Sequence, residues 1–75
     1  MNDKKTQRAL NVNNFGLNLY KVRNNQKITV EKLAEMLDVS TRIIYDWESG
    51  KKIPTFPRAV EIANVLRVSL DSILC

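Results

Sequence analysis

One segment near the middle of the chain, residues 41–49, combines several kinds of hydrogen-bonding side chain at helical spacing. As a helix, it would turn Ile44 and Trp47 toward the interior. Its outward side would then carry Thr41, Arg42, Tyr45, Asp46 and Ser49. Lys51 and Lys52 follow directly, and two ammonium groups suit phosphate as point charges. Donors of this kind beside two cations fit a polar, anionic partner.

The residue types that most catalytic and metal sites require are nearly missing. The chain has no histidine and one cysteine, Cys75, at its last position. A zinc or other thiolate–imidazole site is therefore nearly excluded, and so is an internal disulfide. No nucleophile–base pattern and no glycine-rich phosphate loop is present. We expect no enzymatic activity, no metal and no cofactor.

Length and composition indicate one small folded domain. The chain has 75 residues, of which 44% are hydrophobic. Such a domain buries a modest core, so a second subunit would add useful stability. No apolar run approaches the roughly 20 residues that span a bilayer, and the first 13 residues lack the apolar core of a secretion signal. We expect a cytoplasmic protein with no membrane partner.

The charge is unevenly distributed. Twelve basic and eight acidic residues give a net charge of +4, which suggests an anionic partner. Residues 29–50 carry two basic and five acidic side chains, whereas residues 51–58 carry three basic ones and no acid. The basic segments on either side would therefore bind phosphate around the acidic segment 29–50, with an affinity that falls steeply with salt.

The spacing of apolar residues predicts helices throughout, and no segment alternates as a half-buried strand does. Residues 1–13 are expected to be a flexible arm and residues 14–75 a compact all-α domain. Its helices are expected at about 14–24, 30–38, 41–49, 56–66 and 70–74.

The helix boundaries follow from capping residues. Thr29, Ser40, Thr55 and Ser69 each precede an apolar repeat and can accept a hydrogen bond from a free amide. Gly50 stands where a helix commonly ends with positive φ. Phe56 is expected on the apolar face of the fourth helix, in line with its alanines and leucine.

Two short helices joined by three residues, the first with a small Ala34 midway, form a helix-turn-helix pattern. It lies in a longer register, LAEMLDVS at 33–40, IYDWESGKKIP at 44–54 and IANVLRVSLD at 62–71. Over residues 15–74 the chain resembles the lambda-repressor-like helix-turn-helix family of Cro, phage repressors and xenobiotic-response-element regulators. The resemblance implies a five-helix DNA-binding domain with the third helix in the major groove.

The resemblance also implies site residues, position by position. Base contacts would come from Thr41, Arg42, Ile43, Tyr45 and Asp46. Phosphate contacts would come from Thr29, Val30, Ser49, Lys51 and Lys52. Arg42 could present its donor fork to guanine, Asp46 could accept from cytosine N4, and Thr41 or Ile43 could meet a thymine methyl.

Two further positions match a structural feature of the family, and three depart from its usual pattern. The family often pairs an arginine late in helix 1 with a glutamate late in helix 3, and Arg23 and Glu48 match as a structural ion pair. Val30 stands where a phosphate-binding glutamine is common, so only its backbone could serve. Asp38 and Arg67 stand where glycines are common, and both would need positive φ.

We therefore expect a sequence-specific transcriptional regulator of bacterial, phage or mobile-element origin that acts as a repressor. Related domains usually bind palindromic operators as homodimers. The alternative is a protein-interaction module of the same fold, such as a toxin-neutralising antitoxin component. The acidic stretch 29–50, Asp46 included, favours that alternative.

Overall fold

The computed structural model describes residues 12–75, and over this range the chain folds into five α-helices without a strand. The helices are α1 (Val12–Asn25), α2 (Val30–Leu37), α3 (Thr41–Ser49), α4 (Phe56–Leu66) and α5 (Leu70–Leu74). The all-α, five-helix expectation is confirmed. Helix α1 begins at Val12, two residues before its expected start, and α2 ends one residue early, at Leu37. The rest of the expected arm, residues 1–11, lies outside the described residues.

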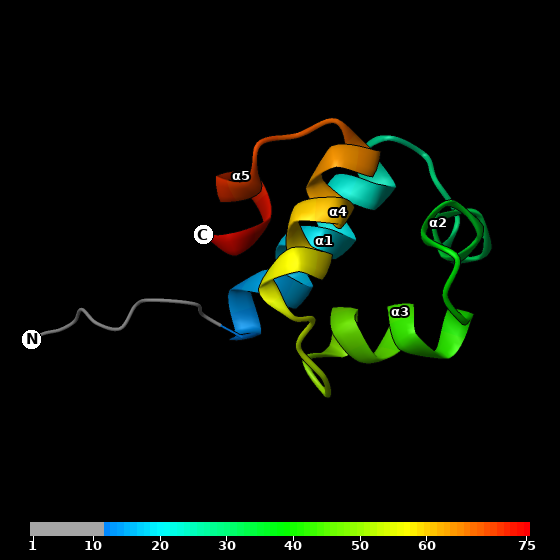
Figure 1. Cartoon of the computed structure of the whole chain (residues 1–75), viewed down its shortest axis with the longest axis horizontal. Coiled ribbons are helices and arrows are strands. Elements are labelled where there is room, and N and C mark those ends of the chain that lie inside the picture. Colours follow the sequence, from blue (N-terminus) through cyan, green and yellow to red (C-terminus); the bar gives the residue numbers. More distant parts are fainter. Residues whose placement is uncertain (1–11) are drawn as a thin grey trace, which may run out of the picture.

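The helices surround one apolar core. In the view of Figure 1, α4 is drawn in front of α1, α5 and the C-terminus lie at one side, and α3 lies along an edge. Helix α1 packs against α3 and α5, while α2 packs against α3 and α4. Each helix contributes at least one fully buried side chain, and the set includes Leu19, Leu33, Ile44, Ile62, Leu66 and Ile73.

Hydroxyl caps fix where three of the helices begin. The amides of Lys32, Ile43 and Arg58 donate to the side chains of Thr29, Ser40 and Thr55 at 3.0, 3.2 and 3.4 Å. Each bond satisfies an amide that the first helical turn would otherwise leave without an acceptor. Ser69 holds the corresponding position before α5, but its hydroxyl meets Ser72 Oγ at 2.9 Å and makes no cap bond, so that expectation was wrong.

Three helices end in one motif that has a non-glycine residue in the left-handed region. Lys27, Asp38 and Arg67 have φ of 59°, 58° and 60°. After each, the next amide reaches back five residues, as from Val39 to Ala34 at 2.9 Å and from Val68 to Ala63 at 3.0 Å. This is the Schellman arrangement, in which glycine is the usual residue. The positive φ expected at Asp38 and Arg67 is present, and Lys27 is a third case.

Replacing Arg67 with glycine is expected to stabilise the domain by about 0.5–1 kcal/mol. A Cβ in the left-handed region costs roughly 1–2 kcal/mol, and glycine's greater freedom in the unfolded chain offsets part of that gain. Chemical denaturation measures the change. Arg67→Ala keeps the Cβ and is the matched control, so an equal gain in both variants would contradict this explanation.

One expected core residue lies outside. Phe56 begins α4 with 63% of its surface exposed, whereas Ala59, Ile62 and Ala63 behind it are buried. The first turn of α4 extends past the edge of the core, so helical periodicity placed Phe56 on the right face but could not show that the core ends before it.

Candidate nucleic-acid interface

The connection between α2 and α3 sets how these helices meet. It holds three residues, and the left-handed Asp38 turns the chain so that Ser40 can cap α3. Ala34 is buried within α2, and its small side chain permits a close crossing of the two helices. Helix α3 lies along one edge of the molecule, and its outer side faces away from α1 and α4 (Figure 1).

The start of α2 offers main-chain donors. The Thr29 hydroxyl and carbonyl accept from Lys32 and Leu33, both at 3.0 Å. Among the described residues, the amides of Val30 and Glu31 have no acceptor. Phosphate contacts were expected here from Thr29 and Val30. The side chain of Val30 is buried, so Val30 could contact a phosphate only through its amide. Free amides at the positive end of a helix form a favourable site for phosphate.

The outer side of α3 carries most of the expected base-contacting residues. The Arg42 side chain is 77% exposed, Tyr45 and Ser49 are exposed, and Thr41 is half-buried at the first position. Ile43 is half-buried and packs against the core, so only part of its side chain faces outward. The exposed set therefore lies on one side of the helix, opposite the buried Ile44 and Trp47.

Asp46 does not project outward, and the expectation that it does was wrong. Its side chain is 8% exposed, and its carboxylate lies 3.8 Å from Arg42 Nε and 3.9 Å from Lys52 Nζ. A carboxylate enclosed in this way is placed to neutralise its two neighbours.

The loop after α3 presents two exposed lysines. Helix α3 ends at Ser49, and the φ of 82° at its C-cap Gly50 turns the chain sharply. The Lys52 amide then donates to the Asp46 carbonyl at 3.1 Å, which ties the loop to the helix. Lys51 and Lys52 are both exposed beside the end of α3, where point charges suit phosphate contacts.

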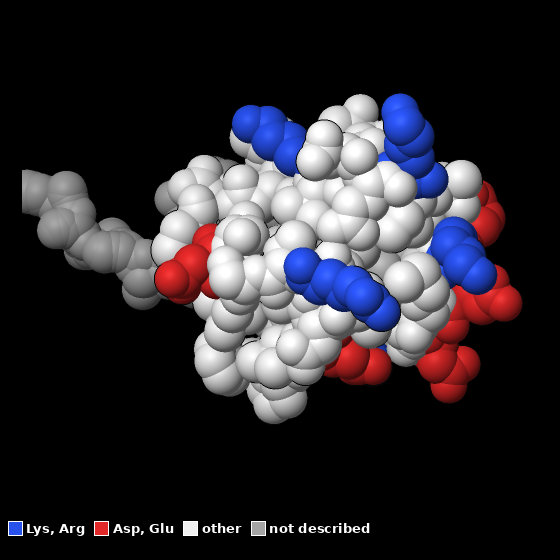
Figure 2. All heavy atoms as spheres, turned by 90° about the horizontal axis from the view of Figure 1, so that it is seen from above, with Lys and Arg blue, Asp and Glu red and all other residues white. Residues whose placement is uncertain are grey.

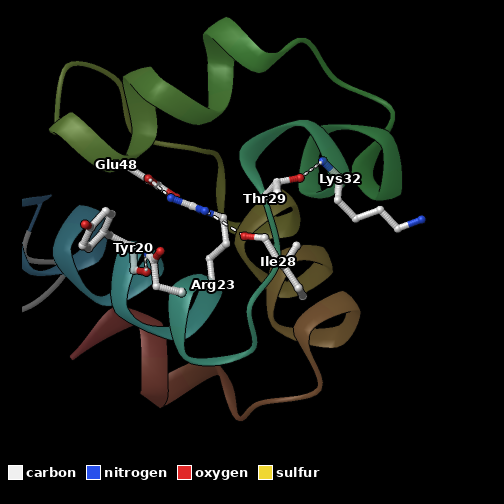
Figure 3. Close-up of polar contacts among 7 residues, drawn as sticks. Tyr20, Arg23, Ile28, Thr29, Lys32 and Glu48 are labelled. Carbon is white, nitrogen blue, oxygen red and sulfur yellow. Dashed lines mark hydrogen bonds and ion pairs between the residues drawn. The ribbon is translucent and has the colours of Figure 1, made fainter.

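An ion pair holds α3 to the scaffold. Arg23 donates from Nε to Glu48 Oε2 at 2.6 Å and from the second terminal nitrogen to Oε1 at 3.1 Å. Its remaining terminal nitrogen donates to the Ile28 carbonyl at 2.8 Å. Figure 3 shows the guanidinium between Glu48 and the main chain just before α2. One side chain thus joins the end of α1, the approach to α2 and the end of α3.

The surroundings of Arg23 favour its charged form. Each side chain is only 9% exposed. The hydrogen bond to Glu48 raises the pKa of Arg23 against the opposing effect of burial. A raised pKa means that the guanidinium is charged at every pH below its ordinary value, and the stability that this charge contributes is lost as the pH rises through the raised pKa. The expected pairing of Arg23 and Glu48 is present, and the bidentate geometry is the strong form of such a contact.

Sequence reasoning missed a second contact between α1 and α3. A Cβ on Gly16 would lie 2.6 Å from the Glu48 carbonyl oxygen and 2.7 Å from that of Trp47. Glycine therefore lets the two helices approach backbone to backbone. The available signal was a glycine inside a helix, which destabilises the helix and so indicates a packing requirement.

The side of the molecule away from α3 has no continuous basic surface among the described residues. Figure 2 views this side and shows basic side chains separated by uncharged surface, with most of the acidic ones toward the end where α2 lies and some at the opposite end. Residues 12–75 contain no cluster of three metal-ligating side chains. Within the same range, no helix combines the length and apolarity needed to cross a bilayer.

Comparison with known proteins identifies the arrangement. The helix-turn-helix family profile matches residues 19–73. The chain is 33% identical over 60 residues to the "Uncharacterized HTH-type transcriptional regulator YqaE" of Bacillus subtilis (strain 168), covering 80% of this chain and 52% of YqaE. It is 37% identical over 60 residues to the "HTH-type transcriptional activator BcrR" of Enterococcus faecalis, covering 80% of this chain and 29% of BcrR.

This chain therefore spans about half of the first relative and less than a third of the second. The matched region includes all of α2, α3 and α4 and most of α5. With its capped helix pair and five-helix core, the chain belongs to the lambda-repressor-like helix-turn-helix family of DNA-binding transcription regulators.

Proposed function

We propose that this chain binds double-stranded DNA sequence-specifically and regulates transcription, with α3 in the major groove. The observation that carries the proposal is the exposed outer side of α3, where Arg42 and Tyr45 extend from a helix fixed to the scaffold by Arg23 and Glu48. A rigidly held helix is what base readout needs, because bidentate hydrogen bonds depend on position and angle.

Phosphate contacts would hold that helix in register. The free amides of Val30 and Glu31 lie at the start of α2, while Lys51 and Lys52 lie beyond the end of α3. Contacts of both kinds position a protein on the duplex without reading its sequence. Binding should weaken with salt in proportion to the number of phosphates that the cations neutralise.

A symmetric homodimer on a palindromic operator is part of the proposal. Two copies of α3 would then lie about 34–36 Å apart, one turn of DNA. Repression by occupancy of the operator is the expected mode of regulation, and a reporter gene placed behind the selected site tests its sign. No catalytic reaction is proposed.

Selection from a randomised duplex pool at two salt concentrations tests the proposal. We expect an enriched short palindrome and an affinity that falls steeply between the two salts. Footprinting on the enriched sequence should then protect two half-sites one helical turn apart. If no sequence is enriched at either salt concentration, the proposed function is refuted.

Replacing Arg42 with alanine is expected to lower the preference for one base pair in each half-site about tenfold. The reason is that the guanidinium fork of Arg42 has the geometry that recognises guanine. Repeated selection with the variant measures the loss. Lys51→Ala is the control, since loss of a phosphate contact should weaken all sequences alike and reduce the salt slope by about one. An unchanged selected sequence with Arg42→Ala would refute base readout by this residue.

The rival function, a protein-docking module such as a toxin-neutralising component, is less well supported. The observation that favoured this alternative was the excess of acidic residues between positions 29 and 50. Two of the five acids there, Asp46 and Glu48, are enclosed and paired with cations, which leaves less acidic surface for a partner. The selection experiment separates the two functions, because a docking module would enrich no DNA sequence.

A further inference from the structure

Asp46 is placed differently from the other acids of the helix-turn-helix. Its side chain is only 8% exposed, yet it lies on the same helix as the exposed Arg42 and Tyr45, whereas the other enclosed acid of α3, Glu48, is bound to Arg23. It contacts one cation on α3 and another in the loop that follows. Its position between the proposed base-reading residue and a proposed phosphate-binding residue calls for a functional explanation.

The contact with Arg42 involves one particular edge of the guanidinium. The Asp46 carboxylate faces Nε at 3.8 Å, from a position one helical turn further along α3. Nε is the Arg42 nitrogen nearest to that carboxylate, and the two terminal nitrogens lie beyond it on a side chain that is 77% exposed. Those nitrogens form the end of the fork that can reach two acceptors of guanine at once. The carboxylate therefore lies beside Nε, behind the end of the fork.

The contact with Lys52 is reinforced by the main chain. The Lys52 amide donates to the Asp46 carbonyl at 3.1 Å, and the Lys52 ammonium lies 3.9 Å from the carboxylate. The Ser49 hydroxyl donates to the same carbonyl at 3.2 Å. Both ends of Asp46 thus hold the lysine loop against the end of α3.

We propose that Asp46 is a positioning residue for DNA recognition, whose carboxylate aligns the Arg42 fork for a guanine and holds the Lys52 loop beside the recognition helix. This inference rests on the function proposed above. Separations of 3.8 and 3.9 Å are those of ion pairs without hydrogen bonds, so both cations remain able to extend toward DNA.

The same carboxylate should also oppose binding to unspecific DNA. In a complex that lacks the matching guanine, Arg42 gains little and the negative charge of Asp46 still repels nearby phosphates. At the correct site, the bidentate contact offsets that repulsion. Asp46 would therefore raise the affinity for the specific site and lower the affinity for nonspecific DNA.

The decisive variant is Asp46→Asn, which keeps the size of the side chain and removes its charge. We expect preference at the base pair read by Arg42 to fall about tenfold, while affinity for random duplex rises. Glu35→Gln is the matched control, because it removes one negative charge from the exposed side of α2, where Glu35 lies 3.7 Å from Lys32. The control should bind all sequences more tightly and select the same bases as the wild type.

A double variant shows whether Asp46 acts through Arg42. Once Arg42→Ala has removed the preference, adding Asp46→Asn should cause no further loss at that base pair, since the two effects share one contact. Independent, additive losses would overturn the positioning role. An Asp46→Asn variant that selects the same bases with the same strength would overturn it as well.

Two further outcomes are distinguishable. If neither the wild type nor Glu35→Gln enriches a sequence, the proposed function itself fails. Thermal unfolding shows whether each variant is folded. Should Asp46→Asn not fold, Asp46→Glu keeps the charge and moves the carboxylate by one methylene. The same loss of preference is then expected, and an unchanged preference overturns the assignment.

Discussion

Replacing Glu48 with alanine is expected to lower the free energy of unfolding by about 3–5 kcal/mol, because it leaves the buried Arg23 guanidinium without its counter-charge. Arg23 would keep its bond to the Ile28 carbonyl, at 2.8 Å, and its position over the Tyr20 ring, 5.7 Å from the ring centroid. A domain of 75 residues has a total stability of roughly 4–11 kcal/mol. The variant should therefore be unfolded in a large fraction or melt far below the wild type.

Glu61→Ala is the control for this result. Arg58 lies 2.7 Å from Glu61, as close as the buried pair, but the two side chains are 34% and 46% exposed. Removal of Glu61 should cost less than about 1 kcal/mol, because solvent screens an exposed pair. Chemical denaturation of both variants makes the comparison. Equal losses would contradict the claim that burial makes the Arg23–Glu48 pair important.

A double variant separates the value of the pair from the penalty of breaking it. Arg23→Met with Glu48→Leu removes both charges and fills similar volume, so it should be more stable than either single change. Its recognition helix would lack the bidentate bonds that fix its angle. We expect such a protein to fold and yet to select DNA less sharply.

The fold could be predicted from the sequence because its signals are local. Hydroxyl caps at Ser40 and Thr55, and the glycine at position 50, mark where α3 begins, where it ends and where α4 begins. Apolar spacing placed the core faces correctly within the helices. Lys27 was missed as a left-handed residue because lysine carries no preference for that conformation, whereas Asp38 and Arg67 stand where the family commonly has glycine.

The site was less predictable, because its arrangement depends on contacts between elements. Helical geometry puts Asp46 on the outer side of α3, but the loop returns Lys52 over it and Arg42 folds toward it from one turn away. A helical projection shows neither of these two contacts with Asp46. The Arg23–Glu48 pair spans 25 residues, and only the family resemblance suggested it. The partner of Gly16 could not be inferred from the residues around it.

Replacing Gly16 with alanine is expected to cost about 2 kcal/mol of stability, although alanine is the better helix former. Alanine's higher propensity returns about 1 kcal/mol, while overpacking costs roughly 1–3 kcal/mol. The upper end applies because the new Cβ would lie 2.6 and 2.7 Å from two carbonyl oxygens of α3. Backbone atoms cannot move aside as the end of a flexible side chain can, so α1 and α3 must separate.

That separation gives the Gly16 variant a second, functional signature. The clash lies at Trp47 and Glu48, in the same turn of α3 that Arg23 holds. Even the folded fraction should therefore present a displaced recognition helix and bind the selected operator more weakly. Lys21→Ala, an exposed change on α1, should alter stability by less than about 0.5 kcal/mol and leave binding intact. A Gly16→Ala protein as stable as the wild type, and equally tight on DNA, would show that the two helices can move apart without cost.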